Sequence, residues 1–242
     1  MTRKALRFRV LQCLPKGFRG SLRSAWRCYR TYGRLTPPSQ AKGAGPSEVY
    51  TTRLFTEWVE ETPRDAVDGT IACILEMFPE ARSCADVGCG PGLYANALAL
   101  RGMDVVAADG SAAAAHFLLP SVTFRVLDFR TGYWPFGCMD LALCLEVGEH
   151  IPQQSAKMLV RTTIQAGQIV VFSAAPPGQG GTDHINLQSG EWWRARFEEQ
   201  GCRYDGPTTR RMRSMLHEHG AMEWIAANVQ CFVGPRSVPA VS

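Results

Sequence analysis

The sequence predicts an α/β fold in which helices cover both faces of a mostly parallel sheet. From residue 83 onward, short apolar segments of strand length alternate with segments of helical periodicity. These strand candidates are apolar on both faces, as expected for strands that helical crossovers bury from two sides. At the end of the chain, a strand, a basic helix and a second strand follow one another, which indicates that an antiparallel hairpin closes the sheet.

Two helices are expected ahead of the sheet. Apolar side chains between Tyr50 and Val59 recur at helical spacing, and residues 64–78 carry a second apolar face. We interpret both as packing helices, because an aromatic stripe at this spacing usually belongs to a core. The alternative is that Tyr50 or Trp58 covers a bound ligand.

The elements of the sheet region follow in chain order. The expected strands are residues 83–89, 104–109, 122–129, 139–145 and 168–173, with shorter ones at 202–205 and 228–233. The expected helices are residues 93–101, 111–118, 154–166 and 190–200, with a basic helical segment at 210–225. Gly102 supplies a helix stop, and residues 174–186 are predicted to form a Pro- and Gly-rich loop.

Composition is typical of a globular protein with one sizeable core. The 242 residues suffice for one α/β domain with appendages. No apolar run reaches the roughly 18 residues that span a bilayer, and the chain does not start with the apolar segment of a secretory signal. Its nine cysteines form no C-x-x-C pair, which argues against a zinc knuckle or a disulfide framework. We therefore expect an intracellular, cytoplasmic protein without a transmembrane segment.

Basic and acidic residues are distributed unevenly along the chain. Residues 1–50 contain eleven Lys and Arg residues and one acid, Glu48, whereas the remainder is acidic on balance. We predict a basic leader with a flexible linker at 1–47, a domain at 48–236 and a C-terminal tail at 237–242. The leader fits three alternatives: a disordered tail, a transit segment that would make the protein mitochondrial, or an arm that contacts nucleic acid or an anionic membrane.

A glycine-rich turn follows the first expected strand. Residues 86–92 read Asp-Val-Gly-Cys-Gly-Pro-Gly. Its glycines leave no Cβ atoms where the backbone must bend sharply and lie against a bound molecule, and the next helix presents unpaired N–H groups. The Gly-x-Gly-x-Gly spacing differs from the dinucleotide fingerprint, and there is no Gly-Lys-Ser/Thr of a P-loop. The turn predicts an adenosine-type ligand.

Acidic residues follow at the ends of the next strands. Asp109 ends the second strand, where a carboxylate can accept hydrogen bonds from both hydroxyls of a ribose. Asp128 ends the third strand and is placed to receive the exocyclic amine of an adenine. Asp86 lies in the glycine turn itself. Three acids in register point to one ligand at one edge of the sheet.

These motifs, with Asp-Leu-Ala-Leu-Cys-Leu-Glu-Val-Gly-Glu-His-Ile at 140–151, resemble the successive motifs of class I S-adenosylmethionine-dependent methyltransferases over residues 66–233. The resemblance implies a Rossmann-like, seven-stranded, mostly parallel sheet with a reversed last strand. It implies S-adenosyl-L-methionine as the cofactor, with its methionine part at the turn, its ribose at Asp109 and its adenine at Asp128. The full set of implied cofactor-binding residues is Asp86, Gly88, Cys89, Gly90, Gly92, Asp109, Gly110, Asp128, Phe129 and Glu146.

The segment after the fourth strand is similar to that of small-molecule O-, N- and C-methyltransferases, including ubiquinone-pathway enzymes. A sulfonium donor needs no activation, so such an enzyme must align the acceptor in line and remove its proton. His150 is the candidate base, with Glu149 beside it and His184 as a second candidate. A structural role for either histidine stays open. We predict methyl transfer to a small-molecule acceptor by in-line displacement.

Other interpretations compete with this one. Glu146, Glu149, His150 and His184 would also suit a metal ion, although we favour a metal-free site. A similar pattern occurs in small-RNA 3′-terminal 2′-O-methyltransferases, where a metal holds the terminal ribose, so a metal-assisted RNA enzyme is one alternative. The acidic balance of the domain argues against nucleic acid as the partner. A non-catalytic module that retains the cofactor pocket is another alternative, and the acceptor and the oligomeric state stay open.

Overall fold

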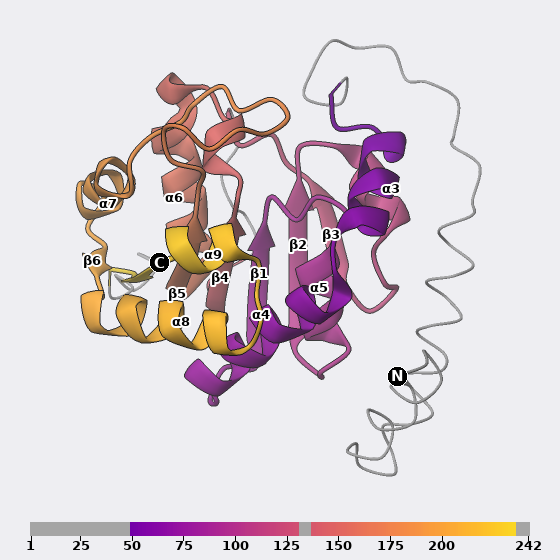
Figure 1. Ribbon diagram of the computed structural model, residues 1–242, viewed down its shortest axis with the longest axis horizontal. Helices are drawn as coiled ribbons and strands as arrows, with labels where there is room; N and C mark the ends of the chain where they lie inside the picture. The colour runs from indigo at the N-terminus through magenta and orange to yellow at the C-terminus, as the bar shows by residue number, and fades with distance from the viewer. Residues whose placement is uncertain (1–48, 131–136, 236–242) are drawn as a thin grey trace, which may run out of the picture.

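The computed structural model describes residues 49–130 and 137–235 (Figure 1). The basic leader and linker at 1–47 and the C-terminal tail at 237–242 lie outside the described residues. The domain boundaries predicted above therefore stay predictions. Among the described residues, no helix has the length and apolar character needed to cross a bilayer.

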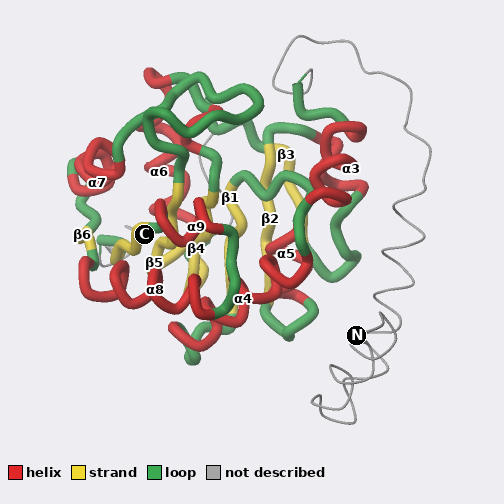
Figure 2. The backbone as a smooth tube through the Cα atoms, viewed as in Figure 1, coloured by secondary structure: helices red, strands yellow, loops and turns green. Residues whose placement is uncertain are grey.

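Within the described residues, seven strands form one sheet in the order β3-β2-β1-β4-β5-β7-β6 (Figures 1 and 2). The strands are β1 (Ser83–Val87), β2 (Asp104–Asp109), β3 (Thr123–Val126), β4 (Met139–Leu145), β5 (Gly167–Ser173), β6 (Arg203–Tyr204) and β7 (Gln230–Val233). The first five strands are mutually parallel, whereas β7 runs antiparallel to both β5 and β6. The predicted parallel core and its reversed last strand are confirmed.

Helices cover both faces of this sheet. The α-helices are α3 (Thr52–Glu61), α4 (Arg64–Met77), α5 (Leu93–Ala99), α6 (Ala156–Ala166), α7 (Gly190–Glu198), α8 (Gly206–Glu218) and α9 (Glu223–Asn228), and the 3₁₀ helices are η2 (Ala112–His116), η3 (Gly148–His150) and η4 (Gln153–Ser155). A hydrophobic core lies on each face of the sheet. One core includes side chains of α4, α5, α8 and α9, and the other includes side chains of α6 and α7 (Figure 1).

Strand β4 shows why the apolar runs form the centre of the sheet. Leu141 and Leu143 belong to one core and Ala142 and Cys144 to the other, and all four are fully buried. Successive side chains of a strand point to opposite faces, so a strand buried on both faces must be apolar throughout. Of the seven described cysteines, all are unpaired and only Cys138 is exposed, which agrees with their interpretation as small core residues.

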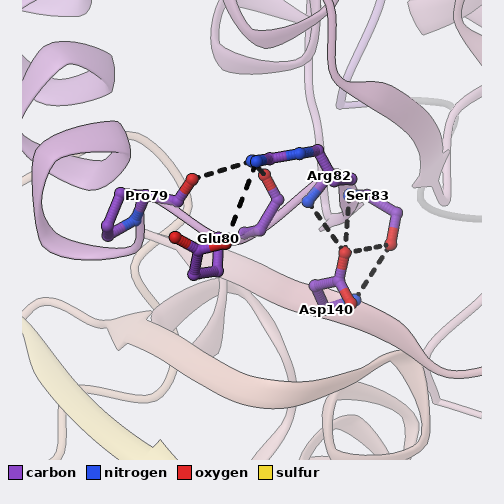
Figure 3. A network of polar contacts seen from close by, with 6 residues as sticks. Pro79, Glu80, Arg82, Ser83 and Asp140 are labelled. Atoms are coloured by element: carbon purple, nitrogen blue, oxygen red, sulfur yellow. Dashed lines mark hydrogen bonds and ion pairs between the residues drawn. The ribbon is translucent and has the colours of Figure 1, made fainter.

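Asp140 at the start of β4 holds the amino-terminal ends of two strands together. Its Oδ2 accepts hydrogen bonds from the backbone N–H groups of Arg82 (2.8 Å) and Ser83 (2.9 Å) and from the Ser83 hydroxyl (2.9 Å), and Asp140 N donates to Ser83 Oγ (Figure 3). These bonds, that of Arg82 first, hold the pKa of Asp140 below its usual value. Asp140 is therefore a structural member of its motif, at the edge of the sheet opposite the carboxyl ends.

Three expected elements differ from the observed ones. The Ala-rich segment forms only the 3₁₀ helix η2, and the chain beyond it is held by Asn96, whose side chain donates to Phe117 O and accepts from Leu119 N, instead of by helical hydrogen bonds. Strand β3 ends at Val126, so Asp128 and Phe129 lie in the loop beyond it. The basic segment at 210–225 is two helices, since the chain turns at Gly220 with a positive φ of 70°.

Candidate active site

A cleft opens at the carboxyl ends of the parallel strands, where the chain order reverses between β1 and β4. This topological switch point is where open α/β sheets bind ligands. Three segments far apart in the chain form its walls: the start of the described chain with α3, the glycine turn with the loops after β2 and β3, and the segments after β4 and β5. The predicted site residues that line it are Gly88, Gly90, Asp109, Gly110, Asp128, Phe129, Glu146 and His150.

Two glycines of the turn are required for different reasons. Gly88 has a φ of 81°, and a Cβ there would lie 2.4 Å from Cγ2 of Val147. Gly90 also has a positive φ, 49°, but the nearest atom to its Cβ position belongs to Trp58 at 3.8 Å. Gly88 is therefore required by packing, whereas Gly90 keeps open the space in front of the turn.

Asp109 is held by backbone N–H groups at the end of β2. Its Oδ2 accepts from Gly90 N and its Oδ1 from Ser111 N, both at 2.8 Å. Burial raises the pKa of this carboxyl, and the two hydrogen bonds oppose that shift. Each oxygen keeps a second lone pair, which suits the two hydroxyls of a ribose.

Asp86 is buried behind the turn with a hydrogen-bonding atom left over. It is 3% exposed, and its Oδ2 has no hydrogen-bond partner in the described part of the chain. Burial raises its pKa to about 7, although the N–H of Ala95 favours the charged form. Asp86 lies in strand β1, just before the turn in which it was predicted to lie. Cys89 and Gly92, also predicted to bind cofactor, are buried in the turn, and the cleft lining does not include any of the three.

Asp128 lies at the rim of the cleft in an ion pair. Its Oδ2 is 2.7 Å from Nη2 of Arg130, and its Oδ1 accepts from the backbone N–H of the same residue at 2.9 Å. The Arg130 side chain holds the pKa of Asp128 below its usual value. The adenine predicted at Asp128 would therefore share this carboxylate with Arg130.

The other side of the cleft, which we call the acceptor side, consists of Tyr50, Glu146, Glu149, His150, Asp183 and His184. Glu146 has a φ of 54°, which is rare for a residue with a Cβ. Its N–H donates to Ser173 O at 3.0 Å, and its Oε2 accepts from Gln179 at 3.2 Å. Its Oε1 has no partner among the described residues, and burial raises its pKa.

Glu149, His150 and His184 converge on the acceptor side. Each offers one ligand atom, and these atoms all lie within 4.8 Å of one another. Glu149 is 0% exposed, and burial, followed by the charge of Glu146, raises its pKa to about 8. Burial lowers the pKa of His150, so this ring is neutral around pH 7. The structure thus brings the three residues predicted to be catalytic together.

Backbone hydrogen bonds hold the loop after β5 against η3. The N–H groups of Ile185 and Asn186 both donate to Glu149 O at 2.9 Å. The buried Asn186 side chain donates to Gly148 O at 3.2 Å. These contacts position His184 beside Glu149 across 35 residues of chain.

The N-terminal wall is the main feature that sequence reasoning missed. Tyr50 donates from its hydroxyl to Asp183 Oδ2 at 3.1 Å, and its ring meets that of His150 edge-on, with centroids 5.7 Å apart. Tyr50, Phe55 and Trp58 all line the cleft, so this stripe forms a cleft wall in addition to packing, and cover for a ligand stays a prediction. Helical periodicity was the available signal, but it does not distinguish a core face from a cleft wall.

The lining of the cleft is electronegative. Its acidic residues, among those that the structure describes, are Asp109, Asp128, Glu146 and Asp183. The same described lining holds only one Lys or Arg residue, Arg130, which is paired with Asp128. Phosphate groups require unpaired Lys or Arg side chains. The described cleft therefore suits a neutral or cationic ligand better than a polyanion.

Comparisons with known proteins agree with this geometry. Residues 85–171 match the family model described as a methyltransferase domain. This segment holds the glycine turn, Asp109, Asp128 and the residues after β4. No curated protein matches the chain.

Several solved structures have a similar fold. A sugar N-methyltransferase from Streptoalloteichus sp. is 15% identical, with 84% of this chain and 99% of that chain covered and a TM-score of 0.57. A TehB-like SAM-dependent methyltransferase from Corynebacterium glutamicum is 15% identical, with 78% and 98% covered and a TM-score of 0.53. A plantazolicin methyltransferase, solved with a substrate analogue and SAH, is 14% identical, with 76% and 91% covered and a TM-score of 0.52. At these identities the likeness shows the fold.

Proposed function

We propose that this chain is an S-adenosylmethionine-dependent methyltransferase of class I that transfers a methyl group to a small-molecule acceptor. Its Rossmann-like fold and the match of residues 85–171 to a methyltransferase domain support the proposal. The observation that carries the proposal is one cleft with two chemically different sides. Asp109 and the glycine turn form one side, and the buried polar residues of the acceptor side form the other. Tyr50 and α3 wall the cleft, which favours an acceptor small enough to be enclosed.

The residues on the cofactor side fit S-adenosyl-L-methionine. The unpartnered Oδ2 of Asp86 suits the ammonium group of its methionine part, and the open space at Gly90 allows the ligand to lie against the backbone. Asp109 is oriented to accept hydrogen bonds from the ribose. When bound, the cofactor supplies an electrophilic methyl group on a sulfonium. The proposed binding set is completed by Gly88, Cys89, Gly92, Gly110, Asp128, Phe129 and Glu146, the last at the boundary with the acceptor side.

Glu149, His150 and His184 are the proposed catalytic residues. They lie at the ends of β4 and β5, beside the cofactor side, and His150 is the member that lines the cleft. Their role is to bind the acceptor in line with the donor and to receive its proton as the methyl is transferred. Glu149 is fully buried, whereas His150 and His184 are half-buried, so the histidines can reach a bound acceptor while Glu149 lies behind them.

Titration calorimetry with S-adenosyl-L-methionine or its demethylated product tests the cofactor assignment. We expect Asp109→Ala to weaken binding at least about tenfold, because a buried carboxylate contributes charge-assisted hydrogen bonds. An affinity unchanged by this substitution would overturn the assignment.

Methyl transfer is tested by incubating the protein with methyl-labelled cofactor and a metabolite extract. Label in the low-molecular-weight fraction supports the proposal, whereas label only in RNA would favour the alternative of a metal-assisted RNA methyltransferase. His150→Ala should lower turnover at least about 100-fold without weakening cofactor binding. The matched control is His217→Ala on α8, an exposed histidine paired with Glu223, which should leave both quantities unchanged.

A further inference from the structure

We propose that Glu149, His150 and His184 bind a divalent transition-metal ion at the acceptor side of the cleft. The inference deepens the proposed function. Only the role of the ion in methyl transfer rests on that function. Binding of the ion itself depends on the three side chains alone. Three separate observations support it: the spacing of the ligand atoms, the orientation of the two imidazoles, and the lack of partners for Glu149.

The spacing of the ligand atoms suits one ion. Atoms within 4.8 Å of one another share a common point about 2.8 Å or less from each, and movements of under about 1 Å would bring them to the ~2.1 Å of metal bonds to nitrogen and oxygen. Both segments that carry these residues are held in place, because Ile185 and Asn186 donate to Glu149 O. The site is thus nearly assembled by the fold.

The two imidazoles are oriented as metal ligands are. His150 Nδ1 lies 3.2 Å from Asp183 O, and His184 Nδ1 lies 3.2 Å from Gln179 O. A carbonyl oxygen only accepts hydrogen bonds, so each Nδ1 carries the proton and each Nε2 keeps a free lone pair. A backbone carbonyl on the non-ligating nitrogen is the usual support of a metal-bound histidine. The rings lie edge to face, with centroids 5.0 Å apart.

Among the described residues, neither carboxylate oxygen of Glu149 has a hydrogen-bond partner, although the residue is 0% exposed. The N–H groups of Glu149 and Ala175 are near enough to favour its charged form, and the carboxyl of Glu146 is near enough to oppose it, but none of the three has hydrogen-bonding geometry to it. Glu146, whose Oε1 is also without a partner in the described chain, adds a second acid. Unpaired buried carboxylates are costly, and a cation between them would offset that cost.

The donor set indicates the class of ion. Two imidazole nitrogens and one carboxylate suit Mn²⁺, Co²⁺ or Zn²⁺, whereas Mg²⁺ and Ca²⁺ prefer oxygen ligands throughout. Three protein ligands leave coordination positions open. His150 lines the cleft, so an open position on its side is accessible to an acceptor.

This geometry points to an acceptor that carries a hydroxyl group. Bound to the ion, the hydroxyl has a lowered pKa and releases its proton to solvent. The oxygen then forms a bond to the methyl carbon as the sulfur–carbon bond breaks, and the electron pair of that bond stays on sulfur as a neutral thioether. In this arrangement His150 holds the ion through Nε2 and has no lone pair left for a proton. The ion, by lowering the pKa of the hydroxyl, therefore takes the place of the base role proposed above for the metal-free ring.

Metal titration of the full-length, tag-free protein after treatment with EDTA tests the proposal. We expect one equivalent of Co²⁺ to bind, with visible absorption of the bound ion, and Mn²⁺ or Zn²⁺ to compete with it better than Mg²⁺. Glu149→Gln and His184→Ala should each weaken Co²⁺ binding at least tenfold, whereas the control His217→Ala should not. Failure of the wild-type protein to bind Co²⁺, Mn²⁺ and Zn²⁺, or unchanged affinity in both variants, would overturn it.

A third variant guards against misfolding of the first two. A Cβ at Gly181 would lie 2.2 Å from Nε2 of His184, so Gly181→Ala displaces the ring without removing a ligand. It should weaken Co²⁺ binding, with circular dichroism reporting the fold of each variant. Cofactor titration separates the two proposals. Normal cofactor binding and methyl transfer in EDTA would overturn the role of the ion in catalysis alone, whereas Co²⁺ binding without cofactor binding would contradict the proposed function alone.

Discussion

The two sides of the cleft are built differently. On the cofactor side, backbone groups and glycines shape the site, and all of its proposed residues except Glu146 come from one continuous stretch between β1 and the loop after β3. On the acceptor side, side chains meet from segments as far apart as Tyr50 and Asp183, 133 residues away in the chain. A cofactor shared by many enzymes can be bound by a short standard motif, whereas an acceptor is recognised by a combination of segments particular to one chain.

Replacing the turn glycines should produce the largest effect and sharpen this comparison. Gly88→Ala should destabilise the protein by roughly 2 to 5 kcal/mol, because it adds a positive-φ penalty to a clash with Val147. Gly90→Ala carries only the backbone penalty, about 1 to 2 kcal/mol in the free energy of unfolding. We expect it to weaken cofactor binding by more than this loss of stability accounts for. Urea unfolding and calorimetry measure the two quantities. Equal stability losses in both variants would show that packing does not distinguish the two glycines.

The buried Asp86 should make the stability of the cofactor-free protein depend on pH. Its pKa is about 7 in the folded state against about 3.9 when unfolded, so the folded state binds the proton more tightly. Stability from this group is present below about pH 4 and is lost as pH rises to about 7. Asp86→Asn retains an acceptor for the N–H of Ala95 and removes the charge, and should stabilise the protein by a few kcal/mol at pH 8 but little at pH 4.

Urea unfolding of Asp86→Asn and the wild-type protein across this pH range measures the difference. The groups that act on Asp86 include Asp109, which raises its pKa further, so Asp109→Asn is a useful companion variant. A constant difference between Asp86→Asn and wild type at all pH values would contradict the assignment of a raised pKa.

On the acceptor side, Tyr50→Phe should have a smaller effect. It removes one hydrogen bond to Asp183, about 1 kcal/mol, and leaves the ring against His150. We expect turnover or acceptor affinity to fall a few-fold while cofactor affinity measured by calorimetry stays the same. A drop in cofactor affinity instead would mean that the two sides of the cleft are coupled and that the division above is wrong.

The smallest effect is expected at the rim. Arg130→Ala breaks a partly exposed ion pair with Asp128, so stability should change by less than about 1 kcal/mol. Because Asp128 is then no longer shared, cofactor affinity should rise, by up to about threefold on the same energy scale. Weaker cofactor binding in this variant would show that Arg130 itself contacts the ligand.

Local patterns predicted the order of strands and helices, because strands such as β4 are apolar on both faces and helix ends are marked by residues such as Gly102. They also predicted the positions of Asp109 and of the glycine turn. The predicted type and bounds of an element were less accurate where contacts with other segments decide them, as for η2 and for the end of β3. Length and pairing of such short elements depend on contacts outside the segment.

The sequence by itself predicted which residues meet on the cofactor side of the cleft, because the turn follows directly on a strand that periodicity identifies, Asp109 ends the next one, and Asp128 lies in the loop just after the third. Only the tertiary structure decided how the acceptor side is arranged. Loops that pack across the sheet bring Tyr50 close to Asp183 and place the carbonyls that fix the proton on Nδ1 of both histidines. The same loops enclose Glu149, whose carboxylate oxygens have no partner among the described residues. Such contacts join residues distant in the chain, and no local pattern of side chains records them.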